Sequence, residues 1–291
     1  MKFGIMFASV GAFASAEGAA TIATAADEMG LESIWSVEHV VIPDGYQSRY
    51  PYNESGRLPL AEGADIPDPL IWLAYVAGVT RRIRLATGIL IVPQRNPLVL
   101  AKECASLDRL SGGRFELGIG VGWLAEEFHA LGVPFEDRGG RTDEYCEAML
   151  ALWGQEKASY HGRYVDFDGA ISLPKPTSGS VPIIVGGHSP AAARRAGRYG
   201  TGFFPVSASD DALPRLFDIM KAEARAHGRD GDAIEVTTGN WSPRRGTLDQ
   251  VKELEDLGIS RLIVAPPTSN LDNMREAMEQ LAERVAAVAT T

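Results

Sequence analysis

Cysteine, excess positive charge and long apolar runs are all scarce in this sequence of 291 residues. The two cysteines, Cys104 and Cys146, each lie inside a helical pattern without a paired spacing, so we expect buried thiols rather than a disulfide framework or a zinc motif. A formal net charge of −10 argues against nucleic acid or an anionic membrane as the main partner. Because no apolar run approaches the roughly 18 residues of a membrane span, we expect a cytoplasmic protein that binds a small molecule.

Several common catalytic signatures are missing as well. The five histidines form no pair with the spacing of metal ligands, so no metal site is predicted. No lysine falls at the end of an expected strand, where a Schiff-base aldolase needs one, and no G-x-S-x-G nucleophile elbow occurs. Cofactor-free and metal-dependent chemistries are therefore weakly supported.

What the sequence does contain is a repeated pattern of strand followed by helix. The expected strands are residues 2–8, 33–37, 83–90, 114–120, 181–185, 202–206, 234–238 and 261–265. The expected helices are residues 17–29 (with Ser15 as the N-cap), 69–79, 97–110, about 141–153, 190–199, 210–227, 248–257 and 271–288. Right-handed crossovers return each strand beside its predecessor, so the pattern predicts an α/β fold with a parallel sheet.

Eight such units can close into a (β/α)8 TIM barrel, which typically takes about 250 residues. The residues beyond this typical length fall in two places, a long loop after the second strand (residues 38–68) and an insertion before the fifth strand (residues 154–180). One domain over residues 1–291 accounts for all eight units.

The first 16 residues have two interpretations. Lys2, an apolar run and the closing Ala14-Ser15-Ala16 resemble a secretory signal with its cleavage site. The same residues also fit the first strand and the cap of the first helix. Cleavage after Ala16 would remove one strand and expose two unpaired sheet edges, so retention of the segment is favoured.

Active sites of such barrels lie at the C-terminal ends of the strands, where two polar sites stand out. Glu38 and His39 follow the second strand, and an imidazole there can act as an acid, a base or a hydrogen-bond donor, or can simply stabilise the loop. Val-Gly-Gly-His-Ser-Pro (residues 185–190) joins the fifth strand to its helix. Small residues and a helix N-terminus favour a bound phosphate there, although two glycines also suit a simple turn.

Glycines end the third and fourth strands as well, at Gly88, Gly120 and Gly122. A dinucleotide fingerprint, G-x-G-x-x-G, would require glycine where Trp123 stands, so that interpretation is set aside. We expect instead that these glycines let a flat ring system lie close to the barrel mouth, with Trp123 and Glu126 beside it. The alternative is ordinary glycine in a strand.

Two arginine clusters could hold an anionic tail or could be solvated surface charges. They are Arg194, Arg195 and Arg198, on the helix after the fifth strand, and Arg244 and Arg245, after the seventh strand.

Taken as a set, the motifs resemble the bacterial luciferase-like monooxygenase family. The residues that carry the resemblance are Ser36-Val37-Glu38-His39, Thr87-Gly88-Ile89, Asn96-Pro97, LDRLSGGR (107–114), GIGVGW (118–123), Glu126-Glu127-Phe128, LGVPF (131–135) with Arg138 and Arg141, and Val185 to Ser189. The match spans nearly the whole chain. Residues 123–128 and 182–204 resemble the branch that uses the deazaflavin coenzyme F420.

The resemblance implies a homodimeric enzyme whose barrel binds a flavin or deazaflavin across the strand ends. It implies a cis peptide bond between Gly88 and Ile89 behind the ring. The candidate cofactor-binding residues are Gly88, Ile89, Gly120, Gly122, Trp123, Gly186, Gly187, His188 and Ser189, of which the backbone amides of the last three hold the phosphate. The candidate catalytic residues are His39, Glu38 and Glu126.

Trp123 departs from the family pattern, because some deazaflavin dehydrogenases of this superfamily carry a catalytic acid at that position. Sugar-phosphate chemistry is therefore in doubt, and Glu126 is the possible substitute. Three functions remain open: hydride transfer between coenzyme F420 and a small organic substrate, a monooxygenase that uses reduced FMN and oxygen, and a flavin-binding barrel without catalysis.

Overall fold

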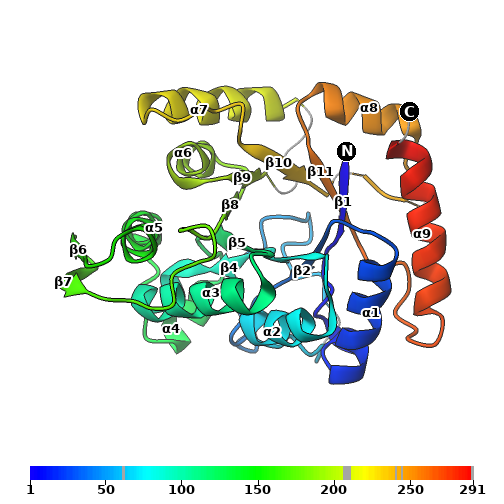
Figure 1. The fold of residues 1–291 in the computed structure, drawn as a ribbon, viewed down its shortest axis with the longest axis horizontal. Coiled ribbons are helices and arrows are strands. Elements are labelled where there is room, and N and C mark those ends of the chain that lie inside the picture. The colour runs from blue at the N-terminus through cyan, green and yellow to red at the C-terminus, as the bar shows by residue number, and fades with distance from the viewer. Residues whose placement is uncertain (61–62, 206–210, 240, 244, 290–291) are drawn as a thin grey trace.

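The computed structural model describes residues 1–60, 63–205, 211–239, 241–243 and 245–289, and it has the expected (β/α)8 barrel (Figure 1). The barrel strands are β1 (Lys2–Ile5), β2 (Ser33–Ser36), β3 (Arg84–Thr87), β4 (Leu90–Ile91), β5 (Phe115–Gly120), β8 (Ile183–Gly186), β9 (Gly202–Phe204), β10 (Glu235–Thr238) and β11 (Arg261–Val264). All pair in parallel. β3 and β4 are successive parts of one barrel strand, and the pairing of β3 with β5 closes the barrel.

Helices surround this ring in the described residues. They are α1 (Ala16–Glu28), α2 (Pro69–Val79), α3 (Pro97–Ser111), α4 (Ala125–Ala130), α5 (Arg138–Gly154), α6 (Pro190–Tyr199), α7 (Leu213–Ala226), α8 (Leu248–Asp256) and α9 (Met274–Ala289). The caps explain where they begin: the Ser15 hydroxyl accepts a hydrogen bond from the N–H of Gly18, and the Asn96 side chain accepts from Leu98 and Val99. Short 3-10 turns cover Gly11–Phe13 and Val92–Gln94.

The first strand is shorter than the sequence predicts. It ends at Ile5 rather than at residue 8, because Phe7 adopts a left-handed backbone conformation (φ 59°) that turns the chain. β1 still pairs with β2 on one side and β11 on the other, as the strand interpretation of the N-terminal residues requires.

The predicted third strand, residues 83–90, divides into β3 and β4 around the Gly88-Ile89 bond, which is cis as the family resemblance implies. The insertion at residues 154–180 contains an antiparallel hairpin, β6 (Ala158–His161) and β7 (Asp166–Ala170), packed beside α5 at the edge of the molecule (Figure 1). The sequence does not predict α4, whose six residues are too few for a clear periodic signal.

The other predicted boundaries agree within a few residues, with α5 and α9 the largest differences at their first turns. Val206 and Asp210, predicted ends of a strand and a helix, lie outside the described residues. Within the described part of the chain, no helix is both long enough and apolar enough to cross a membrane.

The barrel interior is filled in layers. An apolar layer across the middle consists of Trp35, Ala86, Ile184, Phe204 and Ile263, with Met6 and Ile89 packed above it toward the mouth. These side chains fill the middle of the barrel, so a ligand can bind only above them, at the C-terminal ends of the strands.

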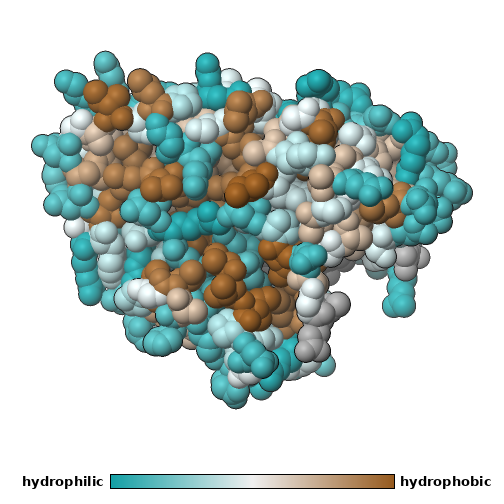
Figure 2. Space-filling model, turned by 90° about the horizontal axis from the view of Figure 1, so that it is seen from below, coloured by the Kyte–Doolittle hydropathy of each residue, from teal (hydrophilic) through white to brown (hydrophobic). Residues whose placement is uncertain are grey.

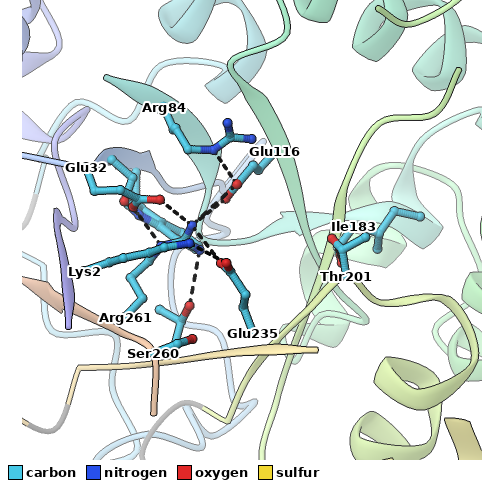
Figure 3. Close-up of polar contacts among 12 residues, drawn as sticks. Lys2, Glu32, Arg84, Glu116, Ile183, Thr201, Glu235, Ser260 and Arg261 are labelled. Carbon is cyan, nitrogen blue, oxygen red and sulfur yellow. Dashed lines mark hydrogen bonds and ion pairs between the residues drawn. The ribbon is translucent and has the colours of Figure 1, made fainter. Parts of the chain in front are cut away.

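A layer of charges, which we call the floor, lies below the apolar layer at the strands' N-terminal ends (Figure 3). Its members are Lys2, Glu32, Arg84, Glu116, Glu235 and Arg261, three cations and three carboxylates. Arg261 is 1% exposed and donates from Nε and Nη2 to both oxygens of Glu32, at 2.8 and 2.7 Å. The floor charges therefore neutralise one another, with Arg261 and Glu116 buried and Lys2 and Glu235 at the solvent-exposed edge.

Candidate active site

A cavity of about 660 Å³ opens at the C-terminal ends of the strands, and we call it the inner cavity. It collects residues from the ends of β2, β4, β5 and β8, from the long loop and from the first turns of α5 and α6. Eleven of the twelve predicted site residues line it: Glu38, His39, Gly88, Ile89, Gly120, Gly122, Trp123, Gly186, Gly187, His188 and Ser189. The twelfth, Glu126, does not.

Ile89 forms a ridge at the base of the inner cavity. A Cβ on Gly120 would lie 2.4 Å from Ile89 Cδ1, and one on Gly186 would lie 2.7 Å from Ile89 Cγ2. A Cβ on Gly88 would lie 2.9 Å from the Trp35 ring. The glycines at these strand ends therefore make room for the ridge, and the cavity base is apolar and free of side chains on either side of it.

His39 is held by a carboxylate that the sequence analysis did not single out. Its Nδ1 lies 3.0 Å from Glu127 Oε2, and Glu127 is fully buried in the first turn of α4. The other oxygen of Glu127 accepts hydrogen bonds from the N–H groups of Val40 and Val41, at 2.7 and 3.3 Å. With Nδ1 directed to Glu127, Nε2 is the nitrogen left for a ligand in the cavity.

Glu38 lines the cavity, but its carboxylate is already bound. Oε1 accepts from Arg95 Nε at 3.0 Å, Oε2 accepts from the N–H of Ile91, and Arg95 also pairs with Asp68 at 2.6 Å. Burial alone would lower the pKa of Arg95, but the two carboxylates outweigh it and raise that pKa. Glu38 therefore joins the loop after β2 to the turn after β4, and its role as a catalytic group stays a prediction.

Glu126 likewise serves the long loop. Its Oε1 accepts hydrogen bonds from the N–H groups of Gln47 and Ser48, at 2.6 and 3.1 Å. Hydrogen bonds from Ser48 and Gln47 lower the pKa of Glu126 to about 2, so it is an anion at neutral pH. Glu126 therefore positions the loop from outside the inner cavity, and its role as a substitute catalytic acid stays a prediction.

One end of the inner cavity is suited to an anion. The N-terminus of α6 opens there, with the Ser189 hydroxyl accepting from the N–H of Ala192 at 3.1 Å. Gly187 adopts φ 117°, and its N–H donates to the Phe204 carbonyl at 3.0 Å. The amide of Gly187 is thus engaged within the protein, and His188 and Ser189 carry the prediction of an anion contact.

Two arginines from neighbouring helices flank this end. Arg195 is 7% exposed and is neutralised by Asp143 at 2.7 Å. Arg138 makes no ion pair with any residue that the structure describes; its Nε donates to the Gly122 carbonyl, and its guanidinium stacks 3.8 Å from the Phe135 ring centroid. Burial lowers the pKa of Arg138. Arg138 is therefore a partly buried cation open to an anionic ligand.

The other arginines that could hold an anionic tail are Arg194, Arg198, Arg244 and Arg245. Arg198 pairs with Glu223 at 2.6 Å, while Arg194 and Arg245 are exposed. Arg244 lies outside the described residues.

The roof of the cavity is an aromatic cluster that sequence reasoning missed. The Trp123 ring meets His39, Tyr46 and Tyr50 edge to face, with centroids 5.7, 5.6 and 5.2 Å apart. Tyr52 contacts the His188 ring in the same way at 5.4 Å, and burial raises the pKa of Tyr50 to about 12. The three tyrosines of the long loop, Tyr46, Tyr50 and Tyr52, were the feature of the sequence that could have indicated this cluster. These rings give the mouth an apolar cover, as expected over a flat ligand.

Comparisons with known proteins agree with this architecture. The model of the luciferase-like monooxygenase family matches residues 1–241. An uncharacterized protein of Mycobacterium tuberculosis is 32% identical over 275 residues, covering 91% of this chain and 93% of that protein. An F420-dependent glucose-6-phosphate dehydrogenase of Kineococcus radiotolerans is 31% identical over 261 residues, covering 81% of this chain and 72% of that protein.

A solved structure supports the same likeness over the whole chain. The monooxygenase RslO1 from Streptomyces bottropensis superimposes with a TM-score of 0.77 at 25% identity, covering 99% of each chain. The fold is therefore shared along nearly the whole length of both chains.

Proposed function

This chain belongs to the luciferase-like monooxygenase family, and from that premise we propose that it is an oxidoreductase that transfers a hydride between coenzyme F420 and an apolar organic molecule. The observation that carries the proposal is the inner cavity, where an apolar base, an anion-suited end and the imidazole of His39 converge. The F420-dependent relative from Kineococcus radiotolerans supports the choice of cofactor.

The residues present fit a planar ring with an anionic tail. The Ile89 side chain rises between Gly120 and Gly186, which have no side chains of their own. A planar ring can therefore lie directly against Ile89. The N–H groups of His188 and Ser189 at the start of α6 and the guanidinium of Arg138 would hold the phosphate. When bound there, a deazaflavin supplies two-electron hydride chemistry, and the protein supplies orientation and exclusion of water.

In this proposal His39 moves the proton and Glu127 orients it. His39 Nε2 exchanges a proton with the substrate oxygen as a hydride leaves or joins the adjacent carbon, so that an alcohol and a ketone are interconverted. Glu127 fixes the imidazole through Nδ1. The aromatic roof of Trp123 and Tyr50 excludes water from the reacting atoms.

Sugar phosphates fit this mouth poorly. Trp123 stands among aromatic rings, and Glu126 is bound to the backbone of the long loop, so neither supplies an acid to the cavity. We therefore do not carry over the substrate of the glucose-6-phosphate dehydrogenase.

A second candidate is a monooxygenase that uses reduced FMN and oxygen. The observation that favours it is the likeness to the monooxygenase RslO1 over the whole chain. The same ridge and anion-suited end would hold FMN.

One experiment separates the two. Purified protein is titrated with F420 and with FMN, and the reduced cofactor is then supplied with a panel of ketones with and without oxygen. Tight F420 binding and oxygen-independent oxidation of the reduced cofactor support the first proposal, whereas oxygen-dependent product formation with FMN contradicts it in favour of the second. His39→Ala should lower turnover by about 100-fold to 10,000-fold with little change in cofactor affinity; unchanged turnover would remove His39 from the mechanism.

We also propose that the protein is a homodimer that joins through α2 and α3. In Figure 2, apolar residues gather on the face where these helices lie. The outward side chains of α2 include Ile71 (74% exposed) and Tyr75 (43%), and those of α3 include Val99 (55%). A helix that is apolar on all sides favours burial against a partner. Light scattering on Ile71→Lys, which should halve the measured mass, tests this contact.

Two further expectations remain predictions. A single domain over residues 1–291 predicts one cooperative unfolding transition in calorimetry. A cytoplasmic location predicts recovery in the cytoplasmic fraction of the source cell.

A further inference from the structure

A second, larger cavity adjoins the inner cavity. It measures about 1190 Å³ and extends across the ends of β9, β10 and β11 to the inner side of α9; we call it the outer cavity. Five residues line both cavities: Met6, Phe7, Tyr50, Tyr52 and Pro59. The two spaces are therefore adjacent, and we call the boundary that these five residues form the neck.

The outer cavity has the chemistry of an apolar binding site. Phe204, Ile263 and Val264 form its base, and Trp241, Pro266 and Pro267 stand along its side. The charged side chains among its described lining residues, Glu283 and Arg284, both belong to α9. A polar or highly charged ligand would find few partners along most of this wall.

Size limits the ligand further. Pockets for drug-sized molecules usually measure about 300–1,000 Å³, so this cavity exceeds the usual range. A ligand with only a few carbon atoms would cover little of the apolar wall and would gain little from its burial. A molecule with several fused rings or a long hydrocarbon chain would cover much more.

Phe7 in the neck is unusual. Its backbone is left-handed (φ 59°), a conformation that a bulky residue rarely adopts, and its side chain is 38% exposed. Such backbone strain persists where the surroundings enforce it and often lies beside a ligand. Its position at the neck, between inner and outer cavities, makes it a boundary for anything that passes from one to the other.

We propose that the outer cavity binds the organic substrate, that this substrate is bulky and largely apolar, and that Phe7 sets how far it reaches into the inner cavity. The inference rests on the proposed function, because it places the cofactor in the inner cavity. In the ketone direction, the carbonyl carbon at one end of the substrate takes up a hydride from the reduced cofactor, and its oxygen takes up a proton from His39. The cofactor is thereby oxidised by two electrons.

The first test is a series of ketones of increasing size, cyclohexanone, 2-decalone and a four-ring steroid ketone, assayed with reduced F420. KM should fall at least about tenfold along the series as more apolar surface is buried. A KM that is flat or rises with size would overturn the proposal.

Ala277→Trp sharpens the test, because Ala277 lines the outer cavity and not the inner one. The added ring should raise KM for 2-decalone and the steroid ketone about tenfold or more, while the affinity for F420 and the KM for cyclohexanone stay unchanged. Glu279→Trp is the matched control, since it adds the same ring on an exposed position of the same helix. If Ala277→Trp fails to fold, Gln280→Trp, at an exposed lining position, replaces it. Equal behaviour of the filled and control variants would contradict the proposal.

Calorimetric titration of the cofactor-free protein with 2-decalone separates this inference from the proposed function. If 2-decalone binds, Ala277→Trp abolishes the binding and the protein shows no F420 turnover, the substrate cavity is supported and the proposed function is overturned. If the protein turns over F420 but 2-decalone binding does not depend on Ala277, the proposed function is supported and the substrate cavity is overturned. Phe7→Ala should raise the kcat ratio of steroid ketone to cyclohexanone by at least about threefold by widening the neck; an unchanged ratio would remove Phe7 as the boundary.

Discussion

The two ends of the barrel treat charge in opposite ways. At the floor, the buried Arg261 is bound to the buried Glu116 and the partly buried Glu32 (Figure 3). At the mouth, Arg138 makes no ion pair within the described residues, and His39 presents one nitrogen to a cavity. The floor charges are satisfied by one another and stabilise the barrel, whereas the mouth has polar groups that a bound ligand would satisfy.

The largest effect is expected from breaking the floor. Arg261→Met removes the buried cation that Glu32 and Glu116 share, which takes this ion pair from Glu32 and leaves Glu116 with Arg84 alone. The free energy of unfolding should fall by about 3–5 kcal/mol. Urea denaturation measures this loss, and cofactor affinity of the folded variant should stay unchanged. Arg275 forms an exposed ion pair with Glu28, so Arg275→Met serves as the control. If Arg261→Met lowers the free energy of unfolding no more than Arg275→Met does, the floor does not stabilise the barrel as proposed.

At the mouth, Glu127→Gln should lower kcat by about tenfold to 100-fold, because the imidazole of His39 loses the charge that orients it. KM and cofactor affinity should hardly change, and Glu127→Asp should restore part of kcat. Steady-state kinetics measures both. A rise in KM with kcat unchanged would assign Glu127 to substrate binding instead.

A smaller effect is expected at the base of the inner cavity. Gly120→Ala should weaken cofactor binding about tenfold, because its Cβ displaces Ile89. The matched control is Gly78→Ala, in α2, where a Cβ would meet no atom within 4 Å and should slightly stabilise the helix. Fluorescence titration of both variants gives the comparison. Equal affinity in the two would mean that Ile89 does not support the ring.

The smallest effect is the pH dependence of the floor. Burial alone would raise the pKa of Glu32, but hydrogen bonding to Arg261 lowers it below the ordinary 4.5. A lowered carboxyl pKa adds stability that is full above pH about 4.5 and is lost as the pH falls through the folded-state value. Wild type should therefore exceed Glu32→Gln in urea midpoint at neutral pH, and the gap should close as the pH falls below 4.5 and through the folded-state pKa of Glu32. A gap that is independent of pH would exclude the ion pair as its cause.

Much of the fold was predictable, because each element carries its own local signal. Ser15, Asn96 and the glycines after α3 mark helix ends, and apolar runs mark buried strands. Phe7 and the cis Gly88-Ile89 bond interrupt strands through backbone conformation, which residue type alone does not reveal, although the family resemblance implied the second.

The site was predictable in position and less so in roles. His39 was expected at the rim, but the choice between Glu126 and Glu127 depends on where α4 begins, since adjacent helical residues point about 100° apart. The pairing of Glu38 with Arg95 joins residues 57 positions apart, and no local pattern encodes it. The aromatic roof likewise depends on how the long loop folds back over Trp123.

A crystal structure of the protein with coenzyme F420 tests the central claim most directly. We expect the deazaflavin ring to lie against Ile89 in the inner cavity, its phosphate to bind at His188 and Ser189, and His39 Nε2 to face the reactive side of the ring. A ring bound at any other place on the barrel, or a phosphate away from the start of α6, would contradict it.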